Sequence, residues 1–137
     1  MIRSRLFLLF LLVYFAVHGT LSAQSGADPG KNSPLTEEQK AQLNEICTNW
    51  KKKEFMAFLK RQKIKLSCAH CERIKVLVEF QVLEEHAHFK ITSAEKCGEN
   101  FSKKQLDEIE LLLMKISFPA SFKGQVFSWD FGNALKC

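Results

Sequence analysis

The sequence predicts an α+β domain in which an N-terminal helix is followed by a β-β-α-β unit, with the helices on one face of a small antiparallel sheet. Two observations indicate helices, because apolar residues recur at helical spacing over residues 36–62 and again over 102–118. A third observation indicates strands, since apolar and polar residues alternate over 74–82, 87–92 and 125–131. The order of these segments along the chain is the predicted topology.

The first helix is expected to begin after Thr36. Thr36 and Gln39 match a capping box, and two acidic residues follow Thr36 in the first turn, where negative charge is favoured. The apolar residues of this segment are Leu43, Ile46, Cys47, Trp50, Ala57 and Phe58. Their spacing predicts one helix that runs to about Gln62, with an interruption near Lys52.

Two alternating segments are predicted to form a β-hairpin. Folding the chain back at Glu84 and Glu85 brings both apolar faces to the same side of the sheet. The predicted opposed pairs are Val82 with Ala87, Phe80 with Phe89, and Val78 with Ile91. Because the turn lacks the Gly or Asn that a two-residue hairpin loop favours, a wider loop is expected.

A second helix and a last strand follow the hairpin. Ser102 and Gln105 form another capping box, and Pro119 is expected to end the helix. One helix face would carry Leu106, Ile109, Leu112, Leu113 and Ile116. In the last strand Phe127, Trp129 and Phe131 alternate with polar or smaller residues, so the first two are predicted to be core rather than binding residues.

Residues 1–23 are predicted to be a secretory signal peptide, because Arg3 and Arg5 precede an apolar run over 6–17 and a small residue, Ala23, ends the segment. An apolar run of about twelve residues is too short to span a bilayer, so no stable membrane span is expected after cleavage. Loss of the two arginines lowers the formal net charge from +5 to +3 (+5 − 2), too little for a nucleic-acid partner.

The predicted mature chain divides into three parts. A flexible linker rich in Ser, Gly and Pro covers 24–35, the helical segment covers 36–66, and the β-β-α-β domain covers 67–137. The predicted location is secreted or periplasmic, where thiols oxidise.

Five cysteines are therefore candidates for disulfides: Cys47, Cys68, Cys71, Cys97 and Cys137. An odd number leaves one thiol free or paired between chains. The predicted hairpin register sets Cys97 opposite Glu72, beside the Cys68-Ala69-His70-Cys71 motif (CAHC). A bridge from Cys97 to Cys71 or to Cys68 is expected to tie the open end of the hairpin. The partners of the remaining cysteines stay open.

The CAHC motif also admits redox or zinc chemistry. A thioredoxin-like motif opens a helix, whereas this one leads into a strand and lacks that stabilisation of a thiolate. His86 and His88 are suitable zinc ligands, but the hairpin places them at its tip, far from the cysteines. A zinc site made of cysteines alone stays an alternative. With no familiar catalytic motif in the chain, we expect no catalytic residue, no metal site and no cofactor.

The segment 74–134 resembles the C-terminal domain of TonB-like periplasmic proteins. The resemblance is carried by the strand pair KVLVEFQV and HAHFKITSAEKCGENF, the amphipathic helix after Ser102, the Phe118-Pro119 pair, and the last strand GQVFSWDF. It implies a non-enzymatic module that binds a protein or peptide partner in the cell envelope. In such domains the partner adds as a strand to a sheet edge. The implied edge comprises Gln125, Val126, Phe127, Ser128, Trp129 and Asp130.

Two other functions stay open. The chain could be a thiol-redox or zinc-binding envelope protein that uses the CAHC pair. It could instead be a secreted inhibitor or effector of the cystatin kind, since small folds with a helix and a sheet share this layout.

Overall fold

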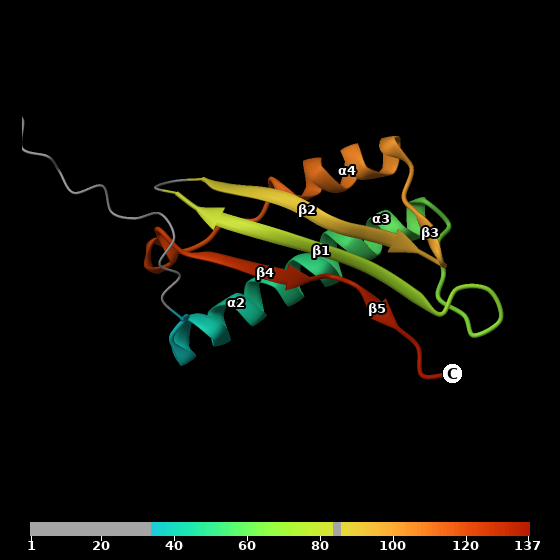
Figure 1. Cartoon of the computed structure of the whole chain (residues 1–137), viewed down its shortest axis with the longest axis horizontal. Coiled ribbons are helices and arrows are strands. Elements are labelled where there is room, and N and C mark those ends of the chain that lie inside the picture. The colour runs from blue at the N-terminus through green and yellow to red at the C-terminus, as the bar shows by residue number, and fades with distance from the viewer. Residues whose placement is uncertain (1–33, 84–85) are drawn as a thin grey trace, which may run out of the picture. The chain divides into compact units, whose positions relative to one another are not determined.

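The computed structural model describes residues 34–83 and 86–137 and confirms the α+β class (Figure 1). The elements are α2 (Glu37–Trp50), the π-helical turn η1 (Lys51–Phe55), α3 (Met56–Arg61), β1 (Arg73–Val82), β2 (Ala87–Lys96), β3 (Glu99–Asn100), α4 (Lys103–Leu113), the 3₁₀ turn η2 (Ala120–Phe122), β4 (Val126–Asp130) and β5 (Asn133–Ala134). The predicted signal peptide, residues 24–33 of the predicted linker and the predicted turn at Glu84 and Glu85 lie outside the described residues.

The strands form one antiparallel sheet in the order β3-β2-β1-β4, and β5 also pairs with β1. The predicted pairs of Val82 with Ala87, Phe80 with Phe89, and Val78 with Ile91 are confirmed. Below Val78 a β-bulge shifts the register by one residue.

The bulge corrects one prediction at the open end of the hairpin. The N–H of Cys97 donates to the carbonyl of Arg73 at 2.9 Å, so Cys97 lies opposite Arg73 and not opposite Glu72. The prediction was wrong by one residue because alternation of residue types does not reveal a bulge where Thr92 and Ser93 are both polar.

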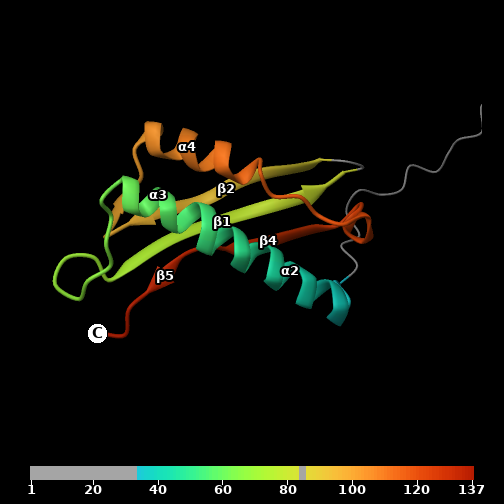
Figure 2. The same ribbon diagram turned by 180° about the vertical axis from the view of Figure 1, so that it is seen from behind.

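Figure 2 shows α2, α3 and α4 on the same face of the sheet, as predicted. Alternation in β1 is the cause, since Ile74, Val76, Val78, Phe80 and Val82 are buried while the residues between them are exposed or half-buried. No helix in residues 34–83 and 86–137 covers the other face of the sheet, which we call the open face. The two helical segments and the sheet therefore share one core.

The first helical segment contains the predicted interruption as a π-helical turn. Its capping box is present, with the N–H of Gln39 donating to Thr36 Oγ1 at 3.1 Å. The π turn adds one residue to the helical repeat, which rotates the following side chains. Phe55 and Phe58 are consequently buried, whereas Ala57, predicted to lie on the apolar face, is exposed.

Helix α4 has the predicted capping box at Ser102 but ends earlier than expected. Its last residue is Leu113, and the chain then leaves the helix before Pro119. Phe118 lies in this connection and packs edge-on against Phe80, with ring centroids 5.3 Å apart. An aromatic contact to the sheet thus replaces the last turn of the predicted helix.

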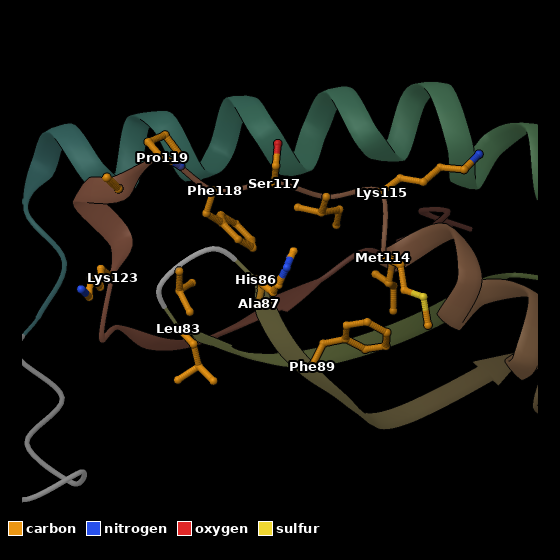
Figure 3. Close-up of a pocket in the computed structure, with 14 residues that line it drawn as sticks. Leu83, His86, Ala87, Phe89, Met114, Lys115, Ser117, Phe118, Pro119 and Lys123 are labelled. Carbon is orange, nitrogen blue, oxygen red and sulfur yellow. The ribbon is translucent and has the colours of Figure 1, made fainter.

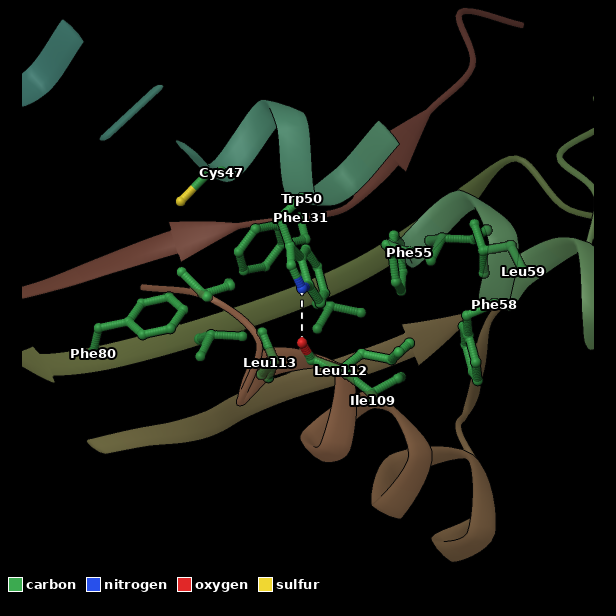
Figure 4. Packing of buried hydrophobic residues seen from close by; sticks show 14 of the residues in the cluster. Cys47, Trp50, Phe55, Phe58, Leu59, Phe80, Ile109, Leu112, Leu113 and Phe131 are labelled. Atoms are coloured by element: carbon green, nitrogen blue, oxygen red, sulfur yellow. Dashed lines mark hydrogen bonds between the residues drawn. The ribbon is translucent and has the colours of Figure 1, made fainter. Parts of the chain in front are cut away.

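The core joins the helices to the sheet through Trp50 (Figure 4). The Trp50 ring packs on Phe131 with centroids 4.5 Å apart, and its Nε1–H donates to the carbonyl of Leu112 at 2.8 Å. This carbonyl lies in the last turn of α4, and it also accepts from the N–H of Lys115 at 3.1 Å. One buried side chain therefore connects α2, α4 and the end of β4.

We predict that Trp50→Phe lowers the free energy of unfolding by about 1 kcal/mol, since it removes one of the hydrogen bonds that the Leu112 carbonyl accepts. The change in urea midpoint at constant m-value measures the loss. Trp129→Phe is the matched control, because Trp129 is only half-buried and the structure gives its ring nitrogen no hydrogen bond. Equal losses in the two variants would show that the indole hydrogen bond contributes nothing.

Candidate functional site

The outer edge of β4 is the surface that the sequence predicts for partner binding, and the structure places β4 at one edge of the sheet. The N–H of Val82 donates to the carbonyl of Gln125 at 3.0 Å, and the N–H of Phe131 donates to the carbonyl of Val76 at 2.9 Å. These bonds determine which β4 residues bond to β1, since antiparallel partners alternate. The residues whose main-chain groups point away from β1 are Val126, Ser128 and Asp130.

The β4 edge is closed just beyond Asp130. Lys51 Nζ donates to the carbonyl of Gly132 at 2.6 Å and to Asn133 Oδ1 at 2.7 Å. Burial lowers the pKa of Lys51, and the charge of Asp130 opposes that shift. Gly132 is needed here, because a Cβ would lie 2.3 Å from the carbonyl oxygen of Ile74. Only a short length of β4 is therefore open to another strand.

The outer edge of β2 is a second open edge, which the sequence analysis missed. Along 87–94 none of the described residues forms a neighbouring strand on its outer side, because β3 pairs only with Glu95 and Lys96. The N–H of Leu83 donates to the carbonyl of His86 at 3.0 Å, which determines the alternation along β2. The outward main-chain groups are those of Ala87, Phe89 and Ile91.

The β2 edge was missed because strand order cannot be deduced from the alternating pattern. A β-β-α-β chain can place its last strand beside the first strand or beside the second, and both arrangements bury the same side chains. Here β4 pairs with β1, so β2 is left at the edge. Knowledge that β1 pairs with β4, for example through Phe80 opposite Phe127, would have identified β2 as an edge strand.

An apolar hollow of about 630 Å³ lies beside the start of β2. Figure 3 shows the side chains that line it, from the hairpin, the end of α4 and the connection to β4. Ala87 and Phe89 of β2 face Met114 and Phe118 across the hollow. Met114 is 67% exposed, an unusual position for a large apolar side chain. The volume falls in the range of ligand-binding pockets.

A second hollow of about 440 Å³ continues along the same strand. Ile91 and Ala94 of β2 form one wall, and Leu106 and Glu110 of α4 form another. Both hollows therefore follow the boundary between the β2 edge and α4.

The open face of β2 carries positive charge. His88 and Lys90 are exposed there, and the structure gives neither of them an ion pair or a side-chain hydrogen bond. Glu79 of β1 lies opposite Lys90, and Gln81 lies opposite His88. His86, which precedes β2, is exposed as well.

The CAHC motif lies at the other end of the sheet and takes part in two disulfides. Cys71 bonds to Cys97, as one of the two expected pairings proposed, and Cys68 bonds to Cys137. The loops they close have sequence separations of 26 and 69 residues, which in a chain-entropy account gives about 3–4 kcal/mol of stabilisation each.

Neither redox nor zinc chemistry is available to the CAHC sulfurs in this state. A redox-active pair would bond within the motif, whereas here each sulfur bonds to a distant cysteine. A zinc ligand must be a thiolate. Within residues 34–83 and 86–137, no cluster of three or more His, Cys, Asp or Glu side chains could hold a metal ion. The two disulfides act as structural links between β1, β2 and the C-terminus.

Cys47 is the one free cysteine of the chain, and it is fully buried in α2. Burial raises the pKa of its thiol to about 12. The reactive thiolate is therefore scarce at neutral pH, and the side chain acts as a small apolar residue of the core.

Comparison of the chain with known protein families, with curated proteins and with solved structures gives no match. The resemblance to TonB-like domains stays a prediction. What the site can do follows from its two open edges, the adjoining hollows and their charges.

We predict a specific pattern of cysteine labelling by iodoacetamide, read by intact mass. The native protein at pH 8 takes up no label, because Cys47 is buried and protonated. In urea without reductant it takes up one label, and after reduction it takes up five. Cys47→Ala is the control and should remain unlabelled until it is reduced. Three labels without reductant would contradict one of the two disulfides.

Proposed function

We propose that this protein is an exported, non-enzymatic binding module that takes an extended segment of a protein partner as an additional strand of its sheet. In strand addition the main-chain groups of the edge supply affinity, and pockets beside the edge select alternate side chains of the partner. The outward main-chain groups of β2 and β4 are candidates for the edge, and the apolar hollows beside β2 are candidates for the pockets.

The observation that carries the proposal is the coincidence of an open edge with apolar hollows. Natural sheets protect long edges with short strands, charges, bulges or covering segments, because an open edge pairs readily with other chains. Lys90 and the bulge after Ile91 give β2 some protection, but no described strand pairs with its outer side over residues 87–91, beside the hollow of about 630 Å³. An edge left open beside an apolar hollow is typical of a surface that is covered by a partner.

Export is supported by the two disulfides, since such bonds persist in oxidising compartments. In the part of the chain that the structure describes, none of the helices is both long and apolar enough to cross a bilayer. Because of the two disulfides, we propose a secreted or periplasmic location, with residues 1–23 as the signal peptide. The resemblance to TonB-like domains agrees with this proposal, because strand addition is how such domains take their partners.

The alternatives receive less support. Disulfide exchange or zinc binding by the CAHC pair would require its sulfurs to be free, and both are bonded to distant cysteines. No observation favours a cystatin-like inhibitor.

A peptide selected from a random library on the immobilised, disulfide-intact protein tests strand addition without knowledge of the natural partner. We expect N-methylation of alternate peptide amides to abolish binding, and N-methylation of the intervening amides to leave it within about threefold, because only every second amide faces the edge. The matched control is the same peptide with N-methyl groups in its flanks. Sensitivity without a two-residue period would contradict strand addition.

A further inference from the structure

We infer that the partner segment binds at the β2 edge, beside Ala87–Ile91, and that it alternates apolar with acidic residues. This inference rests on the proposed strand addition and adds which edge is used and which class of sequence it accepts.

Both edges offer three outward residues, and β2 is favoured over β4 because the apolar hollows adjoin β2. Beyond Asp130 the β4 edge is closed by Lys51, which occupies the carbonyl of Gly132. The β2 edge continues from Ala87 to the bulge with every second residue directed outward. A strand that pairs there gains its main-chain hydrogen bonds without displacing a hydrogen bond between β2 and the other described strands.

The apolar half of the pattern follows from the direction of the side chains. Residues directly opposite each other in paired strands point to the same face of the sheet. A partner residue paired with Phe89 or Ile91 would thus direct its side chain to the helix-covered face, toward the hollows between β2 and α4. Apolar side chains gain free energy there, and a charged side chain would lose its hydration.

The acidic half of the pattern follows from the charges on the open face. The intervening residues of the partner would lie beside His88 and Lys90, which are exposed and without an ion pair. Glu79 lies on the far side of Lys90 and Gln81 on the far side of His88, in β1, so both basic groups remain accessible from the β2 edge. Carboxylates opposite these side chains are attractive, and ammonium groups are repulsive.

The same charges disfavour a second copy of this chain. If two β2 edges paired antiparallel with Phe89 opposite Ile91, the two Lys90 side chains would face each other. Like charges in opposed positions destabilise a strand pair. The edge is therefore suited to an acidic partner and not to itself.

Two fluorescent peptides of about ten residues, alternating Val with Glu and Val with Lys, test the inference by fluorescence anisotropy. We expect the Val–Glu peptide to bind about tenfold more tightly at low salt, with the preference reduced in about 0.5 M salt. The double variant His88→Glu and Lys90→Glu should reverse the preference. A block peptide with the same composition but no alternation should not bind.

Two variants serve as controls. Lys52→Glu with Lys53→Glu changes the formal net charge by −4 (−2 − 2), at least as much as the −3 (−1 − 2) of the β2 double variant. These side chains are exposed on η1, and the variant should keep the preference for Glu. Ser128→Pro removes an outward N–H from the β4 edge and should also have no effect.

The outcomes separate this inference from the proposed function. If Ser128→Pro abolishes binding and the β2 charge variants do not alter it, strand addition occurs at β4. That result would overturn the inference about β2 and leave the proposed function standing. No binding of either alternating peptide to the disulfide-intact protein would overturn both. A dimer of the free protein by sedimentation, dissociated by Ala87→Pro, would make a second copy the occupant and would also overturn the inference.

Discussion

Strand β1 imposes a two-residue alternation on which the rest of the structure depends. Its even-numbered residues direct their side chains to the core and their main-chain N–H and C=O groups to β4. Its odd-numbered residues direct their side chains to the open face and their main-chain groups to β2. Phe80 lies at the centre of this pattern and contacts the rings of Phe89, Phe118, Phe127 and Phe131. The neighbours of β1 are β2 and β4, and each is the outermost described strand over most of its length. The sheet therefore presents two edges.

The two ends of the sheet differ, because one end carries the disulfides and the other carries the larger of the two hollows. At one end the disulfides tie β1 to β2 through Cys71 and Cys97, and tie the CAHC loop to the C-terminus. At the other end lie the hairpin tip and the larger hollow. Covalent links at one end hold the strand register while the other end remains open, so a partner strand would meet an edge that is already ordered. Such preorganisation reduces the entropy that binding has to offset.

Much of this fold is predictable from the sequence, since two-residue alternation in 74–82 and both capping boxes are local signals that burial then confirms. A bridge from Cys97 to Cys71 or Cys68 followed from hairpin register, and the structure shows the one to Cys71, although a bulge moved Cys97 by one residue. The exposure of Ala57 follows from the π-helical turn. It was not predicted from the sequence because an added helical residue leaves no signature in residue types. The β2 edge was unpredictable for another reason: strand order depends on contacts between distant segments, which alternation does not encode.

Amide hydrogen exchange along β2, measured residue by residue by NMR, tests the central claim most directly. In the free protein the N–H groups of Phe89 and Ile91 should exchange at least about a hundredfold faster than those of His88 and Lys90, which bond to β1. Saturation with the alternating Val–Glu peptide should slow exchange at Phe89 and Ile91 and leave Val126 and Ser128 of β4 unchanged. Uniform protection along β2 in the free protein, or protection by the peptide only on β4, would contradict the account.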